Sequence, residues 1–288
     1  MLRIALPNKG RLSEETRELF ADAGLPVKAR GERALTASLG GEFEAIFVRA
    51  QDIPEFVADG AADAGVTGWD LVCESERPLE MRLDLDFGRC RLVVAAREES
   101  GIERLSQIMS GRVATVFPRI TRRFFSRPGC EVEIVPVSGA AEIAPHLGIA
   151  DIVVDLTSTG STLKVNGLRE IETVLESSAR LVTRQRLTPA SDPAKERAVD
   201  ELVTALESVL HARGQRYVMA NVPRTTLDQV KGILPGINGP TIVDILNGGL
   251  HVAVHAVVPA TAVFRTIARL KALGASGILV TRIERLMP

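Results

Sequence analysis

Residues 151–163 read Asp151-Ile152-Val153-Val154-Asp155-Leu156-Thr157-Ser158-Thr159-Gly160-Ser161-Thr162-Leu163. We expect Ile152–Val154 to be a buried strand that leads to an acid, Asp155, and then to a loop of hydroxyl residues around Gly160. Such a loop presents many N–H and O–H donors in a small space, and its glycine lets the backbone approach a ligand closely. Because a helix is expected directly afterwards, the stretch predicts a phosphate site. The Asp155 carboxylate is placed to accept hydrogen bonds from sugar hydroxyls.

A polar turn is the plain alternative for this loop, because serine and threonine are common in turns for local reasons. Five hydroxyl residues directly after the acid favour phosphate binding over a turn alone. The loop is not a Walker A sequence, since no Gly-Lys-Ser or Gly-Lys-Thr closes it, and it lacks the dinucleotide spacing. The stretch therefore suits a molecule with a phosphate at one end and a ribose diol at the other.

The bulk composition is that of an ordinary globular protein. The 288 residues allow two or three domains, and 45% are hydrophobic and 25% charged. A formal net charge of −1 provides no global basic field for nucleic acid or anionic membranes. The start, Met1–Pro7, does not read as a signal peptide, and no apolar segment is long enough to span a membrane. Cys73, Cys90 and Cys130 are too widely spaced for a zinc cluster, so we expect packing residues in a reducing compartment, the cytoplasm.

Alternating strand and helix signals over the first two thirds of the chain predict an α/β fold. Strands are expected at Arg3–Leu6, Phe43–Val48, Ala64–Thr67, Leu92–Ala96, Arg112–Val116, Glu131–Val137 and Ile152–Val154. Helices are expected from an N-cap at Ser13 to Phe20, from Asp52 with Pro54 in the first turn, at Ala140–Leu147 despite Pro145, and at Ala194–Arg213. A polar linker, Leu187–Pro193, precedes the last of these helices.

An internal echo links two parts of this region. The sequence Gly60-Ala61-Ala62-Asp63-Ala64-Gly65-Val66 resembles Gly148-Ile149-Ala150-Asp151-Ile152-Val153-Val154. Each copy places Ala-Asp before a strand and a glycine-containing loop after it. Although so short a match allows coincidence, we infer two similar α/β lobes that face each other across a cleft. Such sheets bind ligands at the carboxyl ends of their strands.

The last part of the chain has a different order of elements, β-α-β-β-α-β. Its expected elements are Tyr217–Val222, Thr226–Leu234, Thr241–Leu246, His251–Val258, Val263–Leu273 and Ile278–Arg282. This is the order of a split βαβ, ferredoxin-like unit, which is more often a binding or assembly module than a catalytic one.

Several of these motifs resemble the ATP phosphoribosyltransferase family, which catalyses the first step of histidine biosynthesis. Asp155–Leu168 is similar to the family signature, Pro7–Leu12 to its amino-terminal motif, and Gly65–Asp70 to the loop after its third strand. The tail Leu270–Val280 resembles the carboxyl-terminal domain of the long form, so the resemblance covers nearly the whole chain.

The resemblance implies a fold and its domains. We expect a two-lobed, periplasmic-binding-protein-like α/β catalytic core, with lobe I at residues 1–92 plus 180–213 and lobe II at residues 93–179. A ferredoxin-like (ACT-like) α+β regulatory domain is expected at residues 214–288.

The resemblance also implies a reaction. N1 of the adenine of ATP attacks C1 of phosphoribosyl pyrophosphate (PRPP), displaces pyrophosphate and forms N1-(5-phosphoribosyl)-ATP, with Mg²⁺ accompanying the pyrophosphate. The protein's task is to position two polyanions and to stabilise the separating charges. No general base is obviously needed, because adenine N1 has a lone pair.

Site residues follow from the resemblance in three groups. The PRPP site is expected to comprise Glu142, Asp155, Thr157, Ser158, Thr159, Gly160, Ser161 and Thr162. Lys9, Arg11, Arg49 and Asp70 are the catalytic candidates, and the ATP site is expected to comprise Lys9, Arg49, Asp70, Leu71 and Phe117. Four of these residues have a plain structural alternative. Arg11 can be a surface charge, Arg49 a salt-bridge partner, Asp70 a residue in the first turn of a helix, and Glu142 a surface carboxylate. Phe117 stands where many relatives have tyrosine, so packing on a base is retained without the hydroxyl.

The carboxyl-terminal domain resembles the family's regulatory module, which binds histidine and gives feedback inhibition. Asn221, Thr241 and Gly277 are expected near the histidine, although relatives can carry an acid at Asn221. The resemblance also implies a homo-oligomer, a dimer or a hexamer, that needs no separate regulatory subunit. The alternatives are a non-catalytic two-lobed small-molecule binding protein and an amino-acid sensor.

Overall fold

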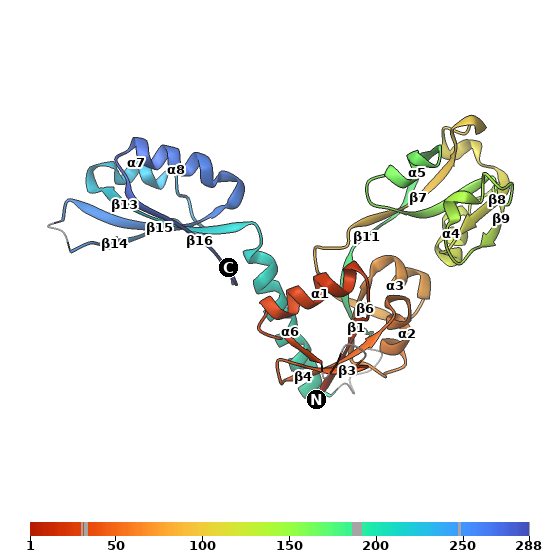
Figure 1. Cartoon of the computed structure of the whole chain (residues 1–288), viewed down its shortest axis with the longest axis horizontal. Coiled ribbons are helices and arrows are strands. Elements are labelled where there is room, and N and C mark those ends of the chain that lie inside the picture. The colour runs from red at the N-terminus through yellow and green to blue at the C-terminus, as the bar shows by residue number, and fades with distance from the viewer. Residues whose placement is uncertain (30, 32–33, 186–191, 247–248, 288) are drawn as a thin grey trace. The chain divides into compact units, whose positions relative to one another are not determined.

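The computed structural model describes residues 1–29, 31, 34–185, 192–246 and 249–287, and the chain divides into two compact units, residues 1–203 and 204–288. Of the predicted linker Leu187–Pro193, residues 187–191 lie outside the described residues. Three β-sheets, of seven, five and four strands, organise the fold (Figure 1).

The seven-stranded sheet has the order β2-β3-β4-β1-β5-β12-β6. Its strands are β1 (Leu2–Pro7), β2 (Val27–Ala29), β3 (Thr36–Leu39), β4 (Phe43–Val48), β5 (Ala64–Gly68), β6 (Leu79–Asp84) and β12 (Ala179–Arg184). The central strands β4, β1 and β5 are parallel, and every residue of β5 is buried. Burial on both faces explains why these strands are nearly continuous apolar runs in the sequence. Each leads to a helix: α1 (Arg11–Asp22), α2 (Ile53–Ala58) and α3 (Trp69–Ser75) respectively follow β1, β4 and β5.

The five-stranded sheet has the order β11-β7-β10-β8-β9. Its strands are β7 (Cys90–Arg97), β8 (Ser110–Thr115), β9 (Glu131–Pro136), β10 (Ile152–Thr157) and β11 (Leu168–Ser177), and its helices are α4 (Pro118–Phe125) and α5 (Ser161–Val165). Side chains of β7, β8 and β10 form one apolar core with Phe117, Ile120 and Phe125. This core holds the strand that leads to the hydroxyl loop.

Two segments connect the sheets, one between β6 and β7 and the other between β11 and β12. The first segment is hydrogen-bonded to the start of β12, directly after the second: the N–H of Leu85 donates to the carbonyl of Ala179 (3.0 Å), and the N–H of Ala179 donates to the carbonyl of Phe87 (2.9 Å). Two lobes joined by a paired double crossing form a periplasmic-binding-protein-like core.

The sequence echo corresponds to one repeated structural unit. Asp63 precedes β5, and its Oδ2 accepts the N–H of Arg3 on the adjacent parallel strand (2.9 Å). Asp151 precedes β10, and its Oδ2 accepts the N–H of Arg112 on the parallel strand β8 (2.8 Å). In both copies the aspartate N–H also donates back to the carbonyl of that arginine. The repeated sequence therefore corresponds to an aspartate that aligns the start of one strand with its parallel neighbour.

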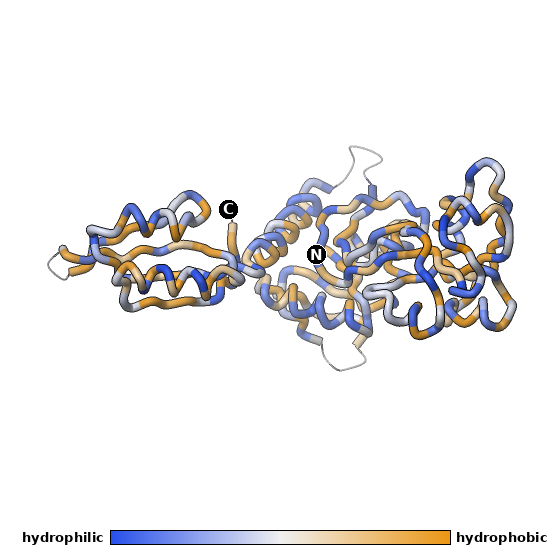
Figure 2. The backbone as a smooth tube through the Cα atoms, turned by 90° about the horizontal axis from the view of Figure 1, so that it is seen from above, coloured by the Kyte–Doolittle hydropathy of each residue, from blue (hydrophilic) through white to orange (hydrophobic). Residues whose placement is uncertain are grey.

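The carboxyl-terminal unit contains the end of α6 (Pro193–Ala212) and a four-stranded antiparallel sheet of order β14-β15-β13-β16. The strands are β13 (Gln215–Pro223), β14 (Thr241–Asp244), β15 (His251–Pro259) and β16 (Ser276–Arg282), and the helices are α7 (Leu227–Lys231) and α8 (Val263–Ala272). This is the predicted ferredoxin-like order. Figure 2 shows long hydrophobic stretches along the strands, whereas hydrophilic and hydrophobic residues alternate along the helices.

One face of this sheet forms the core, and the other is open. Alternate residues of β13 and β15 are buried with Val230, Leu234 and Leu270 from the helical side. The intervening residues, including Tyr217, Asn221 and His255, lie on the opposite face. The alternation follows from the two-residue period of a strand.

Some expected element boundaries are wrong. Ser13 is not the N-cap of α1: Gly10 occupies that position with φ 77°, and Ser13 is buried inside the helix. Ala140–Leu147 forms only a 3₁₀ helix at Ala141–Ile143 and turns, because Pro145 cannot donate to a helical hydrogen bond. The strand expected at Ile152–Val154 continues to Thr157, so Asp155 lies within β10 instead of after it.

The three cysteines are free and partly buried. Cys73 and Cys130 pack against the apolar core of the five-stranded sheet. Burial raises the pKa of the Cys73 and Cys90 thiols. Cys73 and Cys130 are therefore packing residues, as expected.

Candidate active site

The hydroxyl loop lies between β10 and α5 and is organised by its own hydrogen bonds. The buried Thr157 hydroxyl oxygen accepts the N–H of Gly160 (2.8 Å), and the hydroxyls of Thr159 and Ser161 are 2.9 Å apart. Gly160 has φ 76°, a left-handed conformation that glycine adopts without strain. The loop is thus pre-formed, with Thr157 as its internal support.

The rest of the loop faces outward. Ser158, Thr159, Ser161 and Thr162 are exposed. Among the described residues, the backbone N–H groups of Ser158, Thr159 and Thr162 have no hydrogen-bond partner. Unpaired N–H and O–H donors at the start of a helix can bind the oxygens of a phosphate.

Glu142 and Asp155 form an acidic pair beside this loop. Burial raises the pKa of the Asp155 carboxyl; the hydrogen bond from the Leu156 N–H (2.8 Å) opposes this, and the nearby Glu142 carboxylate adds to it. Glu142 lies in the 3₁₀ helix that follows Ala140, whose φ of 48° is strained for a residue with a side chain. The backbone thus holds two like charges together, an arrangement that suits shared recognition of a diol.

The candidates of the other lobe follow three neighbouring strands. Lys9 follows β1, Arg49 follows β4 and Asp70 follows β5, and all three strands are parallel. Pro7 pairs with Val48, and the Asn8 N–H donates to the Val48 carbonyl (2.9 Å), so the loops that carry Lys9 and Arg49 are adjacent. Both cations are exposed, and no ion pair within the described part of the chain includes either of them.

Arg11 and Leu12 lie at the start of α1, close to the crossing between the sheets. Arg11 forms an exposed ion pair with Glu15 (2.9 Å), one helical turn away. A Cβ added at Gly88 in the crossing would lie 2.7 Å from the Leu12 side chain, so the two segments are in close contact. The amino-terminal motif is therefore packed against the connection between the lobes.

Asp70 is buried at the start of α3 and bound to the other crossing. Its N–H donates to the Ser177 hydroxyl (3.0 Å), and that hydroxyl donates to the Asp70 carboxylate. Burial raises the pKa of Asp70, and the Ser177 hydrogen bond opposes the rise. Nothing local in the sequence indicated Ser177, because it lies 107 residues away from Asp70.

The two remaining ATP candidates contact the core of the five-stranded sheet. Phe117 is part of that core and is 4% exposed, and Leu71 of α3 packs against it. Glu74, also on α3, accepts the N–H groups of Arg119 (2.9 Å) and Ile120 (3.0 Å) at the start of α4. The Arg119 guanidinium donates back to the Glu74 and Ser75 carbonyls. This reciprocal contact of α3 with α4 was not anticipated from the sequence.

The histidine candidates share the open face of the carboxyl-terminal sheet. Asn221 pairs with Ala253, and Thr241 pairs with His255, which places both on the side opposite the buried valines. A Cβ added at Gly277 would lie 3.0 Å from the Asn221 amide nitrogen. Asn221 and Gly277 are therefore in contact, and Thr241 lies on the same face.

Comparisons with known proteins agree with this architecture. The family model described as HisG, ATP phosphoribosyltransferase, matches residues 49–208, and the model for the HisG C-terminal domain matches residues 212–285. An ATP phosphoribosyltransferase of Gemmatimonas aurantiaca is 70% identical over 292 aligned residues, covering 100% of both chains. One from Haloarcula marismortui is 52% identical, covering 99% of this chain and 100% of that one.

A solved structure is similar in its core. It is the ATP phosphoribosyl transferase (HisG:HisZ) complex from Thermotoga maritima, with a TM-score of 0.61 and 29% identity over 72% of this chain and 96% of that chain. These matches define a transferase that acts on a phosphorylated sugar. The chain belongs to the ATP phosphoribosyltransferase family, in its long form.

The enzyme thus catalyses the first step of histidine biosynthesis, in which the phosphoribosyl group of PRPP is transferred to N1 of ATP. This excludes the alternative of a binding protein without chemistry. Within the part of the chain that the structure describes, no helix has the length and hydrophobicity to cross a bilayer.

Proposed function

We propose that residues 155–162 hold the 5-phosphate and ribose of PRPP. The exposed hydroxyls and unpaired N–H groups of the loop bind the phosphate, and Asp155 with Glu142 accepts hydrogen bonds from the ribose diol. The observation that carries this proposal is the pre-formed loop. Thr157 accepts the Gly160 N–H, whereas the N–H groups of Ser158, Thr159 and Thr162 have no partner among the described residues. Such pre-organisation lowers the entropy lost when the ligand binds.

Lys9 and Arg49 are proposed to neutralise negative charge on the substrate phosphates during the reaction. When the C1–O bond of PRPP breaks, positive charge develops on the ribose and negative charge on the pyrophosphate. Two cations without competing ion pairs are suited to stabilise that leaving group or the triphosphate of ATP. Arg11 has the same role in this proposal but must exchange its Glu15 partner, an exposed pair of low strength.

The adenine of ATP is proposed to lie near Asp70, Leu71 and Phe117, between the two lobes. Asp70 follows β5 beside the loops of Lys9 and Arg49, and Ser177 fixes its carboxylate. Leu71 and Phe117 provide apolar surface in the same region, since both contact one core. In this arrangement positioning supplies most of the catalysis.

Mg²⁺ is proposed to enter with the substrate phosphates. Among residues 1–29, 31, 34–185, 192–246 and 249–287, no group of three or more His, Cys, Asp or Glu side chains could hold a metal ion. The Glu142–Asp155 pair offers the oxygen ligands that Mg²⁺ accepts in addition to phosphate and water. When bound there, the ion would supply charge neutralisation for the pyrophosphate.

The carboxyl-terminal domain is proposed to bind histidine on its open face and to inhibit the enzyme. Asn221 and Gly277 are in contact there, and Thr241 adds a hydroxyl to the same face. Asn221 offers the ligand's amine a neutral acceptor instead of a charge, which predicts modest inhibition.

The remaining proposals concern organisation. The core is proposed to divide into lobe I (1–92 plus 180–213) and lobe II (93–179), followed by the regulatory domain (214–288). We further propose that the enzyme works in the cytoplasm as a homo-oligomer, a dimer or a hexamer. It needs no separate regulatory subunit, because the chain carries its own HisG C-terminal domain.

The test is turnover with ATP, PRPP and Mg²⁺, with and without histidine, followed through pyrophosphate release. Histidine should lower the rate, and Asn221→Asp should lower the half-inhibitory concentration about tenfold, because a charged acceptor replaces a neutral one. Asn238→Asp, in an exposed turn of the same domain, is the matched control. The assigned histidine site is contradicted if histidine does not inhibit. It is also contradicted if the half-inhibitory concentration is unchanged in Asn221→Asp but changes in the control.

A further inference from the structure

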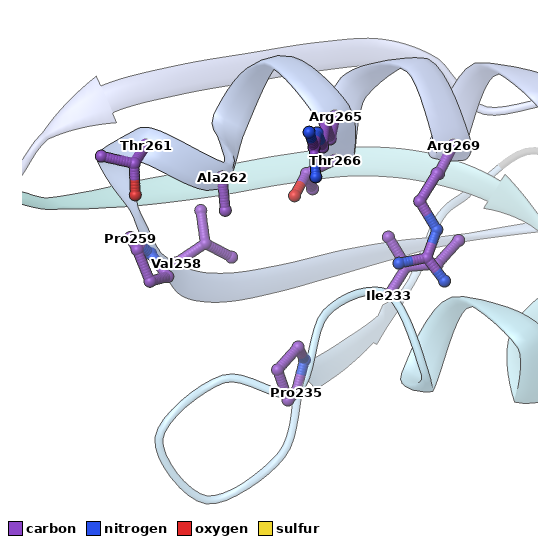
Figure 3. A pocket seen from close by; sticks show the side chains of 9 residues that line it. All are labelled: Ile233, Pro235, Val258, Pro259, Thr261, Ala262, Arg265, Thr266 and Arg269. Atoms are coloured by element: carbon purple, nitrogen blue, oxygen red, sulfur yellow. The ribbon is translucent and has the colours of Figure 1, made fainter.

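A cavity of about 490 Å³ lies on the helical side of the carboxyl-terminal sheet. Figure 3 shows its walls: α8 above, the end of β15 behind, and the loop after α7 below. Ile233, Pro235 and Val258 supply much of the apolar lining. A volume of this size is in the range that holds small organic ligands.

Two arginines, Arg265 and Arg269, line this cavity one helical turn apart on α8. In Figure 3 the Arg269 side chain extends from α8 toward Ile233. No acidic residue lines the cavity, and within the described part of the chain neither arginine forms an ion pair or a side-chain hydrogen bond. The two positive charges at this cavity are therefore available to a ligand.

A largely buried threonine in the cavity wall provides an independent observation. Thr266 lines the cavity and is only 6% exposed. A threonine within a helix commonly donates its hydroxyl to the carbonyl four residues earlier. Thr266 makes no side-chain hydrogen bond to any described residue. Its oxygen is not one of the fully buried, unpartnered atoms of the described residues, so it is open to the cavity and can pair with a ligand oxygen.

The charge of the region supports an anion. Nine basic and four acidic residues occur from Thr204 to Pro288, whereas the whole chain has a formal net charge of −1. Asp228 and Asp244, two of the four acids, are paired with Lys231 and Arg224. The domain therefore carries an excess of positive charge that attracts anions.

We propose that this cavity binds a small organic anion, a carboxylate or a phosphate monoester with a compact apolar body. Arg265 and Arg269 pair with the charged end, Thr266 donates to one of its oxygens, and Ile233, Pro235 and Val258 cover the apolar end. The site is distinct from the proposed histidine site, because Val258 belongs to the helix-covered face of the sheet and Asn221 to the open face. It is also independent of the catalytic proposal.

The test is a titration of the full-length enzyme with phenyl phosphate, phenylacetate and the neutral benzyl alcohol, followed through ¹³C-methyl NMR. The expected result is saturable shifts of the Ile233 and Val258 methyl groups, with a Kd of about 1 mM or tighter for at least one anion and no saturation by benzyl alcohol. Response to one anion alone identifies the source as phosphate monoester or carboxylate. The Leu163 methyl groups, beneath the PRPP loop, report separately on binding at the active site.

Matched variants complete the test. The double variant Arg265→Gln/Arg269→Gln should weaken the anion at least tenfold, whereas Lys271→Gln should change it less than twofold, because Lys271 is on the same helix but does not line the cavity. Thr266→Val keeps the side-chain shape and should weaken binding about threefold. Equal binding of benzyl alcohol, unchanged affinity in the double variant, or absence of Ile233 and Val258 shifts would each overturn the proposal.

Discussion

At the residue scale, the Asp155 carboxylate lowers the stability of the free enzyme and is also the group proposed to bind the ribose diol. Burial raises its pKa, so the folded enzyme binds this proton at a higher pH than the unfolded chain does. The resulting contribution to stability is complete below the unfolded pKa and is lost as the pH rises through the folded pKa. At neutral pH the ionised carboxylate therefore destabilises the free enzyme, and a bound diol would offset this.

Asp155→Asn is therefore expected to change stability and binding in opposite directions. At pH 7.5 the Tm of the free enzyme should rise by about 2 °C, and the gain should shrink as the pH is lowered toward 4. The KM for PRPP should rise about tenfold or more, because hydrogen bonds to a charged acceptor are lost. Thermal scans and steady-state kinetics measure the two effects, with Glu131→Gln on the exposed part of β9 as control. A lower Tm together with an unchanged KM for PRPP would contradict this account of Asp155.

Ser177 is the second residue whose substitution has a specific expected effect. Its hydroxyl binds the buried Asp70 carboxylate and lowers a pKa that burial raises. Ser177→Ala should therefore move the acid limb of the pH profile of kcat/KM for ATP to higher pH and should cost about 2 kcal/mol of stability. The control is Ser126→Ala, whose hydroxyl donates only to the Arg122 carbonyl on the surface. A loss of stability with an unmoved pH profile would reduce Ser177 to a purely structural role.

At the element scale, α3 joins the two sheets of the core. It follows β5 of the seven-stranded sheet, yet Leu71 and Cys73 pack against the core of the five-stranded sheet. Glu74 then caps α4, whose first residue, Pro118, has no N–H to be satisfied. A short helix is thus fixed at both of its ends, by Ser177 at Asp70 and by α4 at Glu74.

Glu74→Ala should weaken this contact measurably. The carboxylate satisfies two N–H groups at the start of α4, and loss of a helix cap costs about 1–2 kcal/mol. Glu76→Ala is the matched control, because Glu76 is exposed and its pair with Arg119 is long, at 3.8 Å. Urea unfolding of both variants measures the difference. Equal midpoints for the two variants would show that the contact contributes nothing.

Much of the element pattern could be predicted from the sequence. Strands β1, β4 and β5 were found because a buried parallel strand is nearly continuously apolar, with the limits of β4 correct and those of β1 and β5 within one residue. Strands β2, β3, β6, β11 and β12 and helix α4 were missed. β6 and β11 have mixed exposure and β11 has irregular pairing, so they lack a clear period. The N–H groups at the start of α4 are capped by Glu74, which lies about 45 residues earlier in the chain, so no local cap residue marked this helix.

At the scale of the whole molecule, the carboxyl-terminal order β-α-β-β-α-β fixed the ferredoxin-like sheet, and the Asp63 and Asp151 echo correctly indicated two related lobes. The candidate site was proposed from its loops: the hydroxyl cluster from the residues that follow Asp155, and Lys9 and Arg49 with the help of the family resemblance. Ser177 and the partner of Glu74 could not be found in this way, since tertiary pairing over 107 and about 45 residues leaves no local signal.

The central claim is that the hydroxyl loop after β10 binds PRPP. Its most direct test is the steady-state kinetics of the double variant Thr159→Val/Ser161→Ala, followed through the absorbance of the N1-substituted adenine. The control is Thr183→Val, which removes a buried hydroxyl that has no hydrogen-bond partner among the described residues. The account predicts a rise of about tenfold or more in the KM for PRPP, a KM for ATP within twofold, and a kinetically silent control. A KM for PRPP that stays at the wild-type value would contradict it.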